Sequence, residues 1–230
     1  MNKTNLRLLL LTSLLLTNII PTTARSEENT SIPVQSSKQS TSIVEAILSL
    51  FKSPERRFIT RGDEVCLVSP GDSGEQLIWS DRPLFIWQGK IPESEINLTE
   101  STKNFGEEEL VWTETVPENT QTIAYTGDEL QLGATYDWEL ISNGTTYRQT
   151  ITLMEESQRE AIAAELAALE NKLENNHATK EDIAIAKADY FIQQQLGYDA
   201  LQQLYSVPNP SSSLTEQITE IERHLCNINE

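Results

Sequence analysis

Apolar residues are spaced in two different ways along this chain, and the change falls near Met154. Before Met154 they alternate with polar residues in short runs rich in threonine, valine and aromatic side chains. In the run 135–140, for example, Tyr136, Trp138 and Leu140 fall on one side of an extended backbone. After Met154 they recur every three or four positions among many alanines and glutamates, the spacing of amphipathic helices. The pattern therefore predicts a β region followed by a helical region.

The β region is expected to be an antiparallel sandwich. The runs that carry the alternation are 64–69, 76–80, 84–89, 94–99, 110–116, 121–126, 134–142 and 146–153. Glycine, proline and asparagine separate these runs, and Asn143-Gly144 is the strongest signal for a tight hairpin. Seven or eight short strands within about 90 residues are typical of a sandwich. We therefore expect a β-sandwich domain over residues 61–153.

The helical region is expected over residues 154–230, as a small α-helical bundle that completes an α+β fold. Four helices are predicted, at about 155–175, 179–196, 198–206 and 212–226. Thr179 with Asp182, and Ser213 with Glu216, have the spacing of capping boxes. These two pairs predict where the second and the fourth helix begin.

Residues 1–24 have the three parts of a secretory signal peptide. Lys3 and Arg7 precede an apolar run over residues 8–20, and small residues lead to a cut after Ala24. An uncleaved membrane anchor is the alternative, although a bilayer span needs about 20 apolar residues. We expect cleavage, which predicts an exported chain, periplasmic or extracellular, with no membrane insertion once the signal is removed.

Residues 25–60 are predicted to form a polar tether that contains one short amphipathic helix. Residues 25–41 are rich in serine, threonine, glutamine and glutamate and have no apolar period. Ser42 and Glu45 then have the spacing of a capping box, and apolar residues follow at helical intervals. Pro54 is expected to end this helix.

The chain is strongly acidic. It has 230 residues, with 35 aspartates and glutamates against 17 lysines and arginines, and a net charge of −18. Such a surface repels phosphate backbones and anionic lipid, so nucleic acid and membrane-surface partners are not expected. Arg56, Arg57 and Arg61 form a basic cluster that is a candidate contact for an acidic partner. Pairing of these arginines with the protein's own carboxylates is the simpler alternative.

Two cysteines, Cys66 and Cys226, stand at the start of the β region and at the end of the last predicted helix. In an oxidising compartment a disulfide between them would persist and would join the two regions. The alternative is two separate buried thiols, because free cysteine packs well as a small apolar side chain.

Several segments resemble known families. The segments 83–87 and 132–138 are similar to parts of fibronectin type III and immunoglobulin-like domains, where an early strand carries a core tryptophan and a later stretch leads into the final hairpin. This resemblance covers about residues 64–153 and implies a fold more than a function. The segment 184–205 resembles a single tetratricopeptide-like helical hairpin, which implies helix packing because a solenoid needs several repeats. The order of segments resembles a family of uncharacterised exported proteins of cyanobacteria, which implies class and location only.

The motifs associated with catalysis or metal binding are weak. The segment 71–74 matches the core of the trypsin-like serine protease signature, but no histidine precedes Ser73, and a polar turn explains the same residues. The integrin-type tripeptide at 61–63 is expected to be a turn. His177 and His224 are isolated, so no metal site is expected. We therefore expect no catalytic, cofactor-binding or metal-binding residues, and an enzyme of unrecognised type stays the less favoured alternative.

Trp79 and Trp112 are the candidate ligand-contact residues, because their positions in the strands leave them the best exposed of the four tryptophans. On the surface of a sandwich they would stack on a sugar, and polysaccharide is then a candidate partner. The simpler alternative is that all four tryptophans belong to the core. The sequence thus predicts an exported, non-catalytic protein-interaction or structural module of the bacterial envelope with an unknown protein partner. A carbohydrate-binding module is the alternative.

Overall fold

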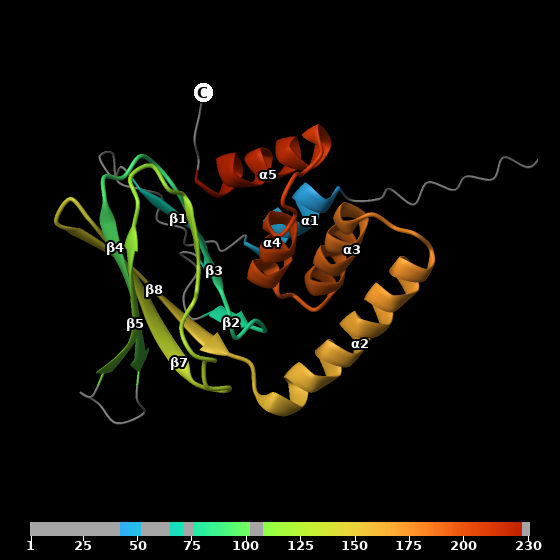
Figure 1. Ribbon diagram of the computed structural model, residues 1–230, viewed down its shortest axis with the longest axis horizontal. Helices are drawn as coiled ribbons and strands as arrows, with labels where there is room; N and C mark the ends of the chain where they lie inside the picture. The colour runs from blue at the N-terminus through green and yellow to red at the C-terminus, as the bar shows by residue number, and fades with distance from the viewer. Residues whose placement is uncertain (1–41, 52–64, 71–75, 102–107, 227–230) are drawn as a thin grey trace, which may run out of the picture. The chain divides into compact units, whose positions relative to one another are not determined.

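Two open sheets and five helices make up a mixed α+β fold in the part of the chain that the structure describes (Figure 1). The structure is a computed structural model, and it describes residues 42–51, 65–70, 76–101 and 108–226. The predicted signal peptide and most of the predicted tether lie outside these ranges. Contacts divide the chain into the units Met1–Gln39 and Ser40–Glu230, and all described residues belong to the second.

The smaller sheet has the strand order β1-β3-β6 and is antiparallel. Its strands are β1 (Cys66–Ser69), β3 (Leu84–Gln88) and β6 (Thr122–Ala124). The central strand β3 is apolar on both faces: Phe85, Ile86 and Trp87 are fully buried. A strand buried on both sides needs a layer packed against each face, and here the second sheet covers one face and helices approach the other (Figure 1).

The larger sheet has the strand order β2-β8-β7-β4-β5. Its strands are β2 (Gln76–Ile78), β4 (Ser94–Ser101), β5 (Glu108–Val116), β7 (Thr135–Ser142) and β8 (Thr145–Leu153). All neighbours are antiparallel except β2, which runs parallel to β8. The sheet therefore has two unlike edges, the three-residue β2 and the nine-residue β5.

The predicted alternation in the segment 135–140 is confirmed. Tyr136, Trp138 and Leu140 are buried, while the residues between them are half-buried on the other face of β7. Asn143 and Gly144, with φ of 50° and 74°, form the turn into β8. Positive φ at both positions is what a tight hairpin turn requires, and asparagine and glycine tolerate it best.

Aromatic rings from both sheets meet in the core. The Phe85 ring of β3 lies 4.9 Å from that of Trp138 and 5.9 Å from that of Trp112, both in the larger sheet. Trp112 also contacts Tyr125 at 5.2 Å. Such pairs add about 0.5–1.5 kcal/mol each to the free energy that comes from burying the rings.

Four helices follow the strands, close to their predicted positions: α2 (Glu156–Asn175), α3 (Lys180–Gln193), α4 (Gly197–Tyr205) and α5 (Ser212–Leu225). The capping box of Thr179 and Asp182 is confirmed. The predicted cap of α5 is wrong, because Ser211 rather than Ser213 accepts the amide hydrogen bond, from Leu214. All three serines at 211–213 are competent caps, and the choice follows from Glu181 of α3, which binds the amide and hydroxyl of Ser211.

The short helix α1 (Ile43–Leu50) forms as predicted, and Ser42 caps it. The helix packs into the fold, because Ile47 is fully buried and Phe51 is 4% exposed, while the rest of the predicted tether lies outside the described residues. The Phe51 ring meets Tyr198 of α4 edge-on at 4.8 Å. Gly197 permits this approach, since a Cβ there would lie 3.0 Å from the Phe51 ring. Helix α1 is therefore part of the helical layer, beside α3, α4 and α5 (Figure 1).

Candidate functional site

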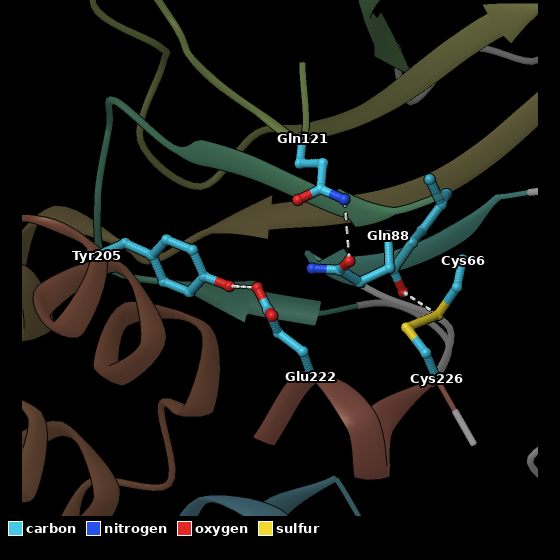
Figure 2. Close-up of a disulfide and its surroundings, with 7 residues drawn as sticks. Cys66, Gln88, Gln121, Tyr205, Glu222 and Cys226 are labelled. Carbon is cyan, nitrogen blue, oxygen red and sulfur yellow. Dashed lines mark hydrogen bonds between the residues drawn. A yellow bond between two sulfur atoms is a disulfide. The ribbon is translucent and has the colours of Figure 1, made fainter. Parts of the chain in front are cut away.

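The two cysteines that the sequence singled out are brought together. Cys66 at the start of β1 and Cys226 directly after α5 form a disulfide with an S–S distance of 2.06 Å (Figure 2). The bond spans 160 residues of sequence and joins the smaller sheet to the last helix. In the chain-entropy description, a cross-link across so long a loop stabilises the folded state by up to about 5 kcal/mol.

A hydrogen bond close to the disulfide connects α5 to its neighbouring helix. The Tyr205 hydroxyl of α4 donates to the Glu222 carboxylate of α5 (Figure 2). Burial raises the pKa of Tyr205, with Glu222 adding to the effect, so the hydroxyl stays protonated and keeps donating. Helix α5 is thus held at one end by a covalent bond to a strand, while Glu222 binds it to α4 and its packing is chiefly against α1.

A second joint between strands and helices lies at the turn from β2 to β3, and its centre is Asp199. This carboxylate of α4 is only 2% exposed. Its two oxygens accept hydrogen bonds from the backbone N–H groups of Trp79 and Ser80, each at 2.9 Å. Two buried amides at the end of a strand are thereby paired by a side chain from a residue about 120 positions away.

Arg159 of α2 approaches the same turn from another side. Its Nε donates to the Trp79 carbonyl at 3.0 Å, and its guanidinium forms an ion pair with Asp81 at 2.8 Å. The guanidinium also lies over the Trp79 ring, 5.0 Å from the centroid, while the indole N–H donates to the Arg159 carbonyl. Partly buried cation–π contacts of this kind contribute about 1 kcal/mol.

Gln202, one helical turn beyond Asp199, binds the last part of the turn. Its Oε1 accepts from the Leu84 amide at 3.3 Å, and its Nε2 donates to the Arg82 carbonyl at 3.0 Å. We call the five residues that hold this turn, Trp79, Asp81, Arg159, Asp199 and Gln202, the turn clamp. The turn clamp thus attaches α2 and α4 to one β connection.

Burial raises the pKa of Asp199 to about 6, and the hydrogen bonds from Trp79 and Ser80 together with Arg159 oppose this rise. Asp199 is therefore ionised at neutral pH and acquires a proton in mildly acidic solution. Because the carboxylate accepts two amide hydrogen bonds, its arrangement fits a structural role.

The surface beside the turn clamp contains two adjoining hollows. One, of about 410 Å³, lies between Leu77 of β2 and the helices α2 and α3, with Ile162 and Tyr190 in its lining. The other, of about 320 Å³, lies between Leu77 and the end of α1, with Phe51 in its lining. Both are lined by Leu77, Gln194 and Leu196. We call the two hollows together the Leu77 groove.

The lining of the Leu77 groove is apolar and amide-rich. Glutamines 76, 158, 194 and 195 contribute amides, and Glu165 is the one carboxylate among the described residues of the lining. The Glu165 carboxylate accepts from the Tyr190 hydroxyl at 2.7 Å. Burial and Glu165 raise the pKa of Tyr190 to about 12. The described part of the lining contains no lysine or arginine, so a bound group would meet there apolar side chains, neutral amides and one negative charge.

The predicted tryptophan contacts are not available for stacking on a sugar. Trp112 is 9% exposed, packs among core rings and donates its indole N–H to Thr126. Trp79 is half-buried, with Arg159 over its ring and the Phe191 ring 5.5 Å away. The expected exposure is wrong for Trp112, because the face of β5 that carries it is the one turned toward the smaller sheet.

The remaining candidates do not assemble a reactive site. The basic residues Arg56, Arg57 and Arg61 and the segment 71–74 lie outside the described residues. Exposed His224 contacts only its own helix α5, through Glu220 and Arg223. Among the described residues, no group of three histidine, cysteine, aspartate or glutamate side chains is placed to hold a metal ion. Within the same residues, no helix has the length and apolar character to cross a bilayer.

Of the turn-clamp residues, the sequence singled out Trp79 alone, as a candidate contact for a ligand, and it did not single out Asp199. The available signal was the position of Asp199 in the first turn of α4, directly after Gly197-Tyr198 and before Ala200-Leu201, all of which are buried. An acid inside an apolar segment indicates a paired or functional carboxylate. In comparisons with known proteins, no family model matches the chain and no curated protein matches its sequence.

Proposed function

We propose that this protein is an exported, non-catalytic protein-interaction or structural module of the bacterial envelope. The observation that carries the proposal is the disulfide between Cys66 and Cys226. Disulfides form and persist in oxidising compartments and are rare in the cytosol, so this bond agrees with the secretory signal expected in residues 1–24.

The finer architecture that we propose is a fibronectin type III or immunoglobulin-like sandwich followed by a tetratricopeptide-like helical region. The contacts of Phe85 with Trp112 and Trp138 across the two sheets support the sandwich. The burial of Ala188, Phe191 and Ala200 in the α3–α4 hairpin supports the helical likeness. A relationship to exported cyanobacterial proteins accompanies this proposal and rests on the order of the segments alone.

A module of this kind acts by presenting a fixed surface. The disulfide and the turn clamp attach the helices to the strands at two separate places, one at β1 and one at the β2–β3 turn. A preordered surface binds more tightly than one that must be ordered on binding, because less conformational entropy is lost. Between these attachments lies the Leu77 groove, which is the surface that we assign to a partner.

Export and oxidation can be tested together. We expect the full chain, produced in a bacterium, to be recovered from the periplasmic or extracellular fraction with residues 1–24 removed and with neither thiol reactive toward an alkylating reagent until it is reduced. The matched control is Lys3→Glu with Arg7→Glu, which removes the basic part of the signal and retains the chain in the cytosol. Recovery of the wild-type chain in the cytosol with both thiols free would refute the proposal.

The interaction role is tested separately by scanning a photo-crosslinking residue over exposed positions in intact cells. We expect a discrete cross-linked protein from positions around the Leu77 groove and no product from exposed positions on α2 such as Glu160 and Glu174. If no exposed position yields a discrete product, the module does not act by binding a protein.

A further inference from the structure

Among the described strands, β2 has a neighbour, β8, on one edge only, and Leu77 lies on the other edge, which we call the open edge. The Ile78 carbonyl accepts the Met154 amide, so Ile78 directs its backbone groups toward β8. Trp79 directs its backbone N–H and C=O the opposite way, to Asp199 and Arg159. Backbone groups two residues apart in a strand face the same side, so the N–H and C=O of Leu77 point away from β8. Within the described residues, no helix side chain binds them as Asp199 and Arg159 bind Trp79.

The Leu77 side chain is exposed at the same place. It is 46% exposed, one of two large apolar side chains among the described residues that are strongly exposed. The two hollows of the Leu77 groove flank it and are lined by Leu196 and Gln194 on the opposite wall. Their volumes lie in the range of sites that hold drug-sized ligands.

We propose that the Leu77 groove binds an extended peptide segment of a partner protein, which adds as a short strand along the open edge of β2. This inference rests on the proposed interaction function and names the chemistry of its partner. Strand addition supplies affinity through backbone hydrogen bonds, here with Leu77, and specificity through alternate side chains, here apolar ones seated in the two hollows.

The charge of the groove further limits which peptide segments can bind. Among the described residues of the lining, Glu165 is the one carboxylate and none is basic, and the chain as a whole has a net charge of −18. An acidic segment is therefore repelled, whereas an apolar segment with a flanking lysine or arginine is attracted. The amides of Gln158, Gln194 and Gln195 offer both donors and acceptors to the amide groups of such a segment.

A segment without helices of its own fits this edge better than a second copy of the chain. The edge is recessed between α1, α2 and the α3–α4 turn, all of which contribute to the lining. The β2 strand of a second copy carries the same helices beside it, so they would have to occupy the space already filled by the first set. The turn clamp ends the accessible edge at Trp79, which limits pairing to a few residues.

The test uses the whole chain and a labelled synthetic peptide of eight residues in which valine alternates with threonine and lysine stands at each end. Two control peptides keep the length: one has proline in place of each valine, and the other has glutamate at both ends. Binding is followed by fluorescence anisotropy for the wild type, for Leu77→Asp, and for Leu110→Asp, which changes the other strongly exposed leucine and is the matched control.

We expect the lysine-ended valine peptide to bind the wild type and Leu110→Asp equally, and Leu77→Asp at least tenfold more weakly. The proline and glutamate peptides should also bind at least tenfold more weakly. Circular dichroism of Leu77→Asp should match that of the wild type, because the side chain is exposed. If the two spectra differ, Gln194→Lys is the second variant, because it places a positive charge in both hollows. It should also bind the lysine-ended valine peptide at least tenfold more weakly than the wild type.

Three results would overturn the inference. One is equal binding of the proline peptide, since proline cannot donate the backbone hydrogen bonds of a strand. Another is absence of binding by any peptide up to millimolar concentration. The third is concentration-dependent dimerisation of the wild type that Leu77→Asp abolishes, which would make the groove an interface between copies. In the first two cases the photo-crosslinking result still decides whether the chain binds a protein through another surface.

Discussion

The two edges of the larger sheet differ in how their backbone groups are protected. Strand β5 is long, antiparallel to its neighbour and exposed, and it carries Glu108, Glu109 and Glu114 together with a register shift where Leu98 and Thr99 of β4 face it. Strand β2 is short, parallel to β8 and has no charged residue, and side chains from two helices bind the backbone just beyond it. Charge and irregular register protect one edge, whereas tertiary contacts protect the other.

The comparison shows that only one edge is suited to receive a strand. Charged residues and bulges are common devices that prevent edge strands from pairing with other chains. On β5 both devices occur, although Leu110 is 57% exposed. On β2 the helices protect Trp79 and Ser80 but leave Leu77 between two hollows. The β2 edge is therefore shielded from large surfaces yet open to a narrow segment.

Of the changes considered, removal of the disulfide is expected to lower the free energy of unfolding most. In the double variant Cys66→Ser with Cys226→Ser, the end of α5 loses its covalent attachment to β1. The free energy of unfolding should fall by about 2–5 kcal/mol, measured by urea denaturation. Hydrogen exchange should accelerate most in α5 and α1, which pack together, and least in β5. An unchanged denaturation midpoint, or an equal acceleration in β5, would contradict this expectation.

Asp199→Ala is the next largest change, because it leaves the amides of Trp79 and Ser80 buried without an acceptor. The free energy of unfolding should fall by about 2–4 kcal/mol. The matched control is Asp137→Ala on β7, where the carboxylate accepts from the hydroxyls of Ser101 and Thr150. Those hydroxyls lie on a partly exposed face and can turn to water, so the control should lose less than about 1 kcal/mol. Equal losses in the two variants would show that the turn clamp is not essential.

The stability of the region around the turn clamp should depend on pH, because burial raises the pKa of Asp199 from its ordinary value of about 4 to about 6. A pKa raised by folding contributes stability that is present below the unfolded pKa and lost as the pH rises through the folded pKa. Relative to Asp199→Asn, which does not titrate, the wild type should therefore lose on the order of 3 kcal/mol between pH 4 and pH 7. Urea denaturation of both proteins across this range measures the difference. If the difference in the free energy of unfolding between the two proteins is constant with pH, the pKa of Asp199 is not raised by folding.

The smallest expected effect concerns the β5 edge. The triple variant Glu108→Thr, Glu109→Thr and Glu114→Thr removes the charge that protects it and should self-associate, while stability changes by under about 1 kcal/mol. Sedimentation velocity measures the association. The matched control removes three exposed glutamates from α2, as Glu156→Gln, Glu160→Gln and Glu174→Gln, with the same change in net charge. If the control associates as strongly, net charge rather than the strand edge governs self-association.

Periodicity along the chain was sufficient to place most elements. All eight strands and all five helices of the described residues lie within a few residues of the expected ranges, since apolar alternation and helical stripes are local properties. The N-cap of α5 could not be determined from the local sequence. Three consecutive serines are equivalent as caps in sequence, and Glu181 from a different helix selects Ser211.

The candidate site was predicted less completely. For Cys66 and Cys226 the sequence left two alternatives, a disulfide or two separate buried thiols, and the structure contains the disulfide. Trp79 was foreseen as a contact residue, but its contacts are internal, with Arg159 and Phe191. The turn clamp joins residues separated by about 80 to 120 positions, and no periodic pattern in either segment reports a partner at such a distance.

Local patterns of side-chain type determine the order of the strands and helices and the faces that they bury. They also identify the pair of cysteines that can bond. Only tertiary packing determined four other features: the parallel placement of β2, the docking of α1 among the later helices, the turn clamp and the Leu77 groove. The physical reason is that hydrophobic burial has no direction, so an apolar stripe specifies that it will be covered but not by what. Long-range hydrogen bonds such as those of Asp199 then select one arrangement among the apolar alternatives.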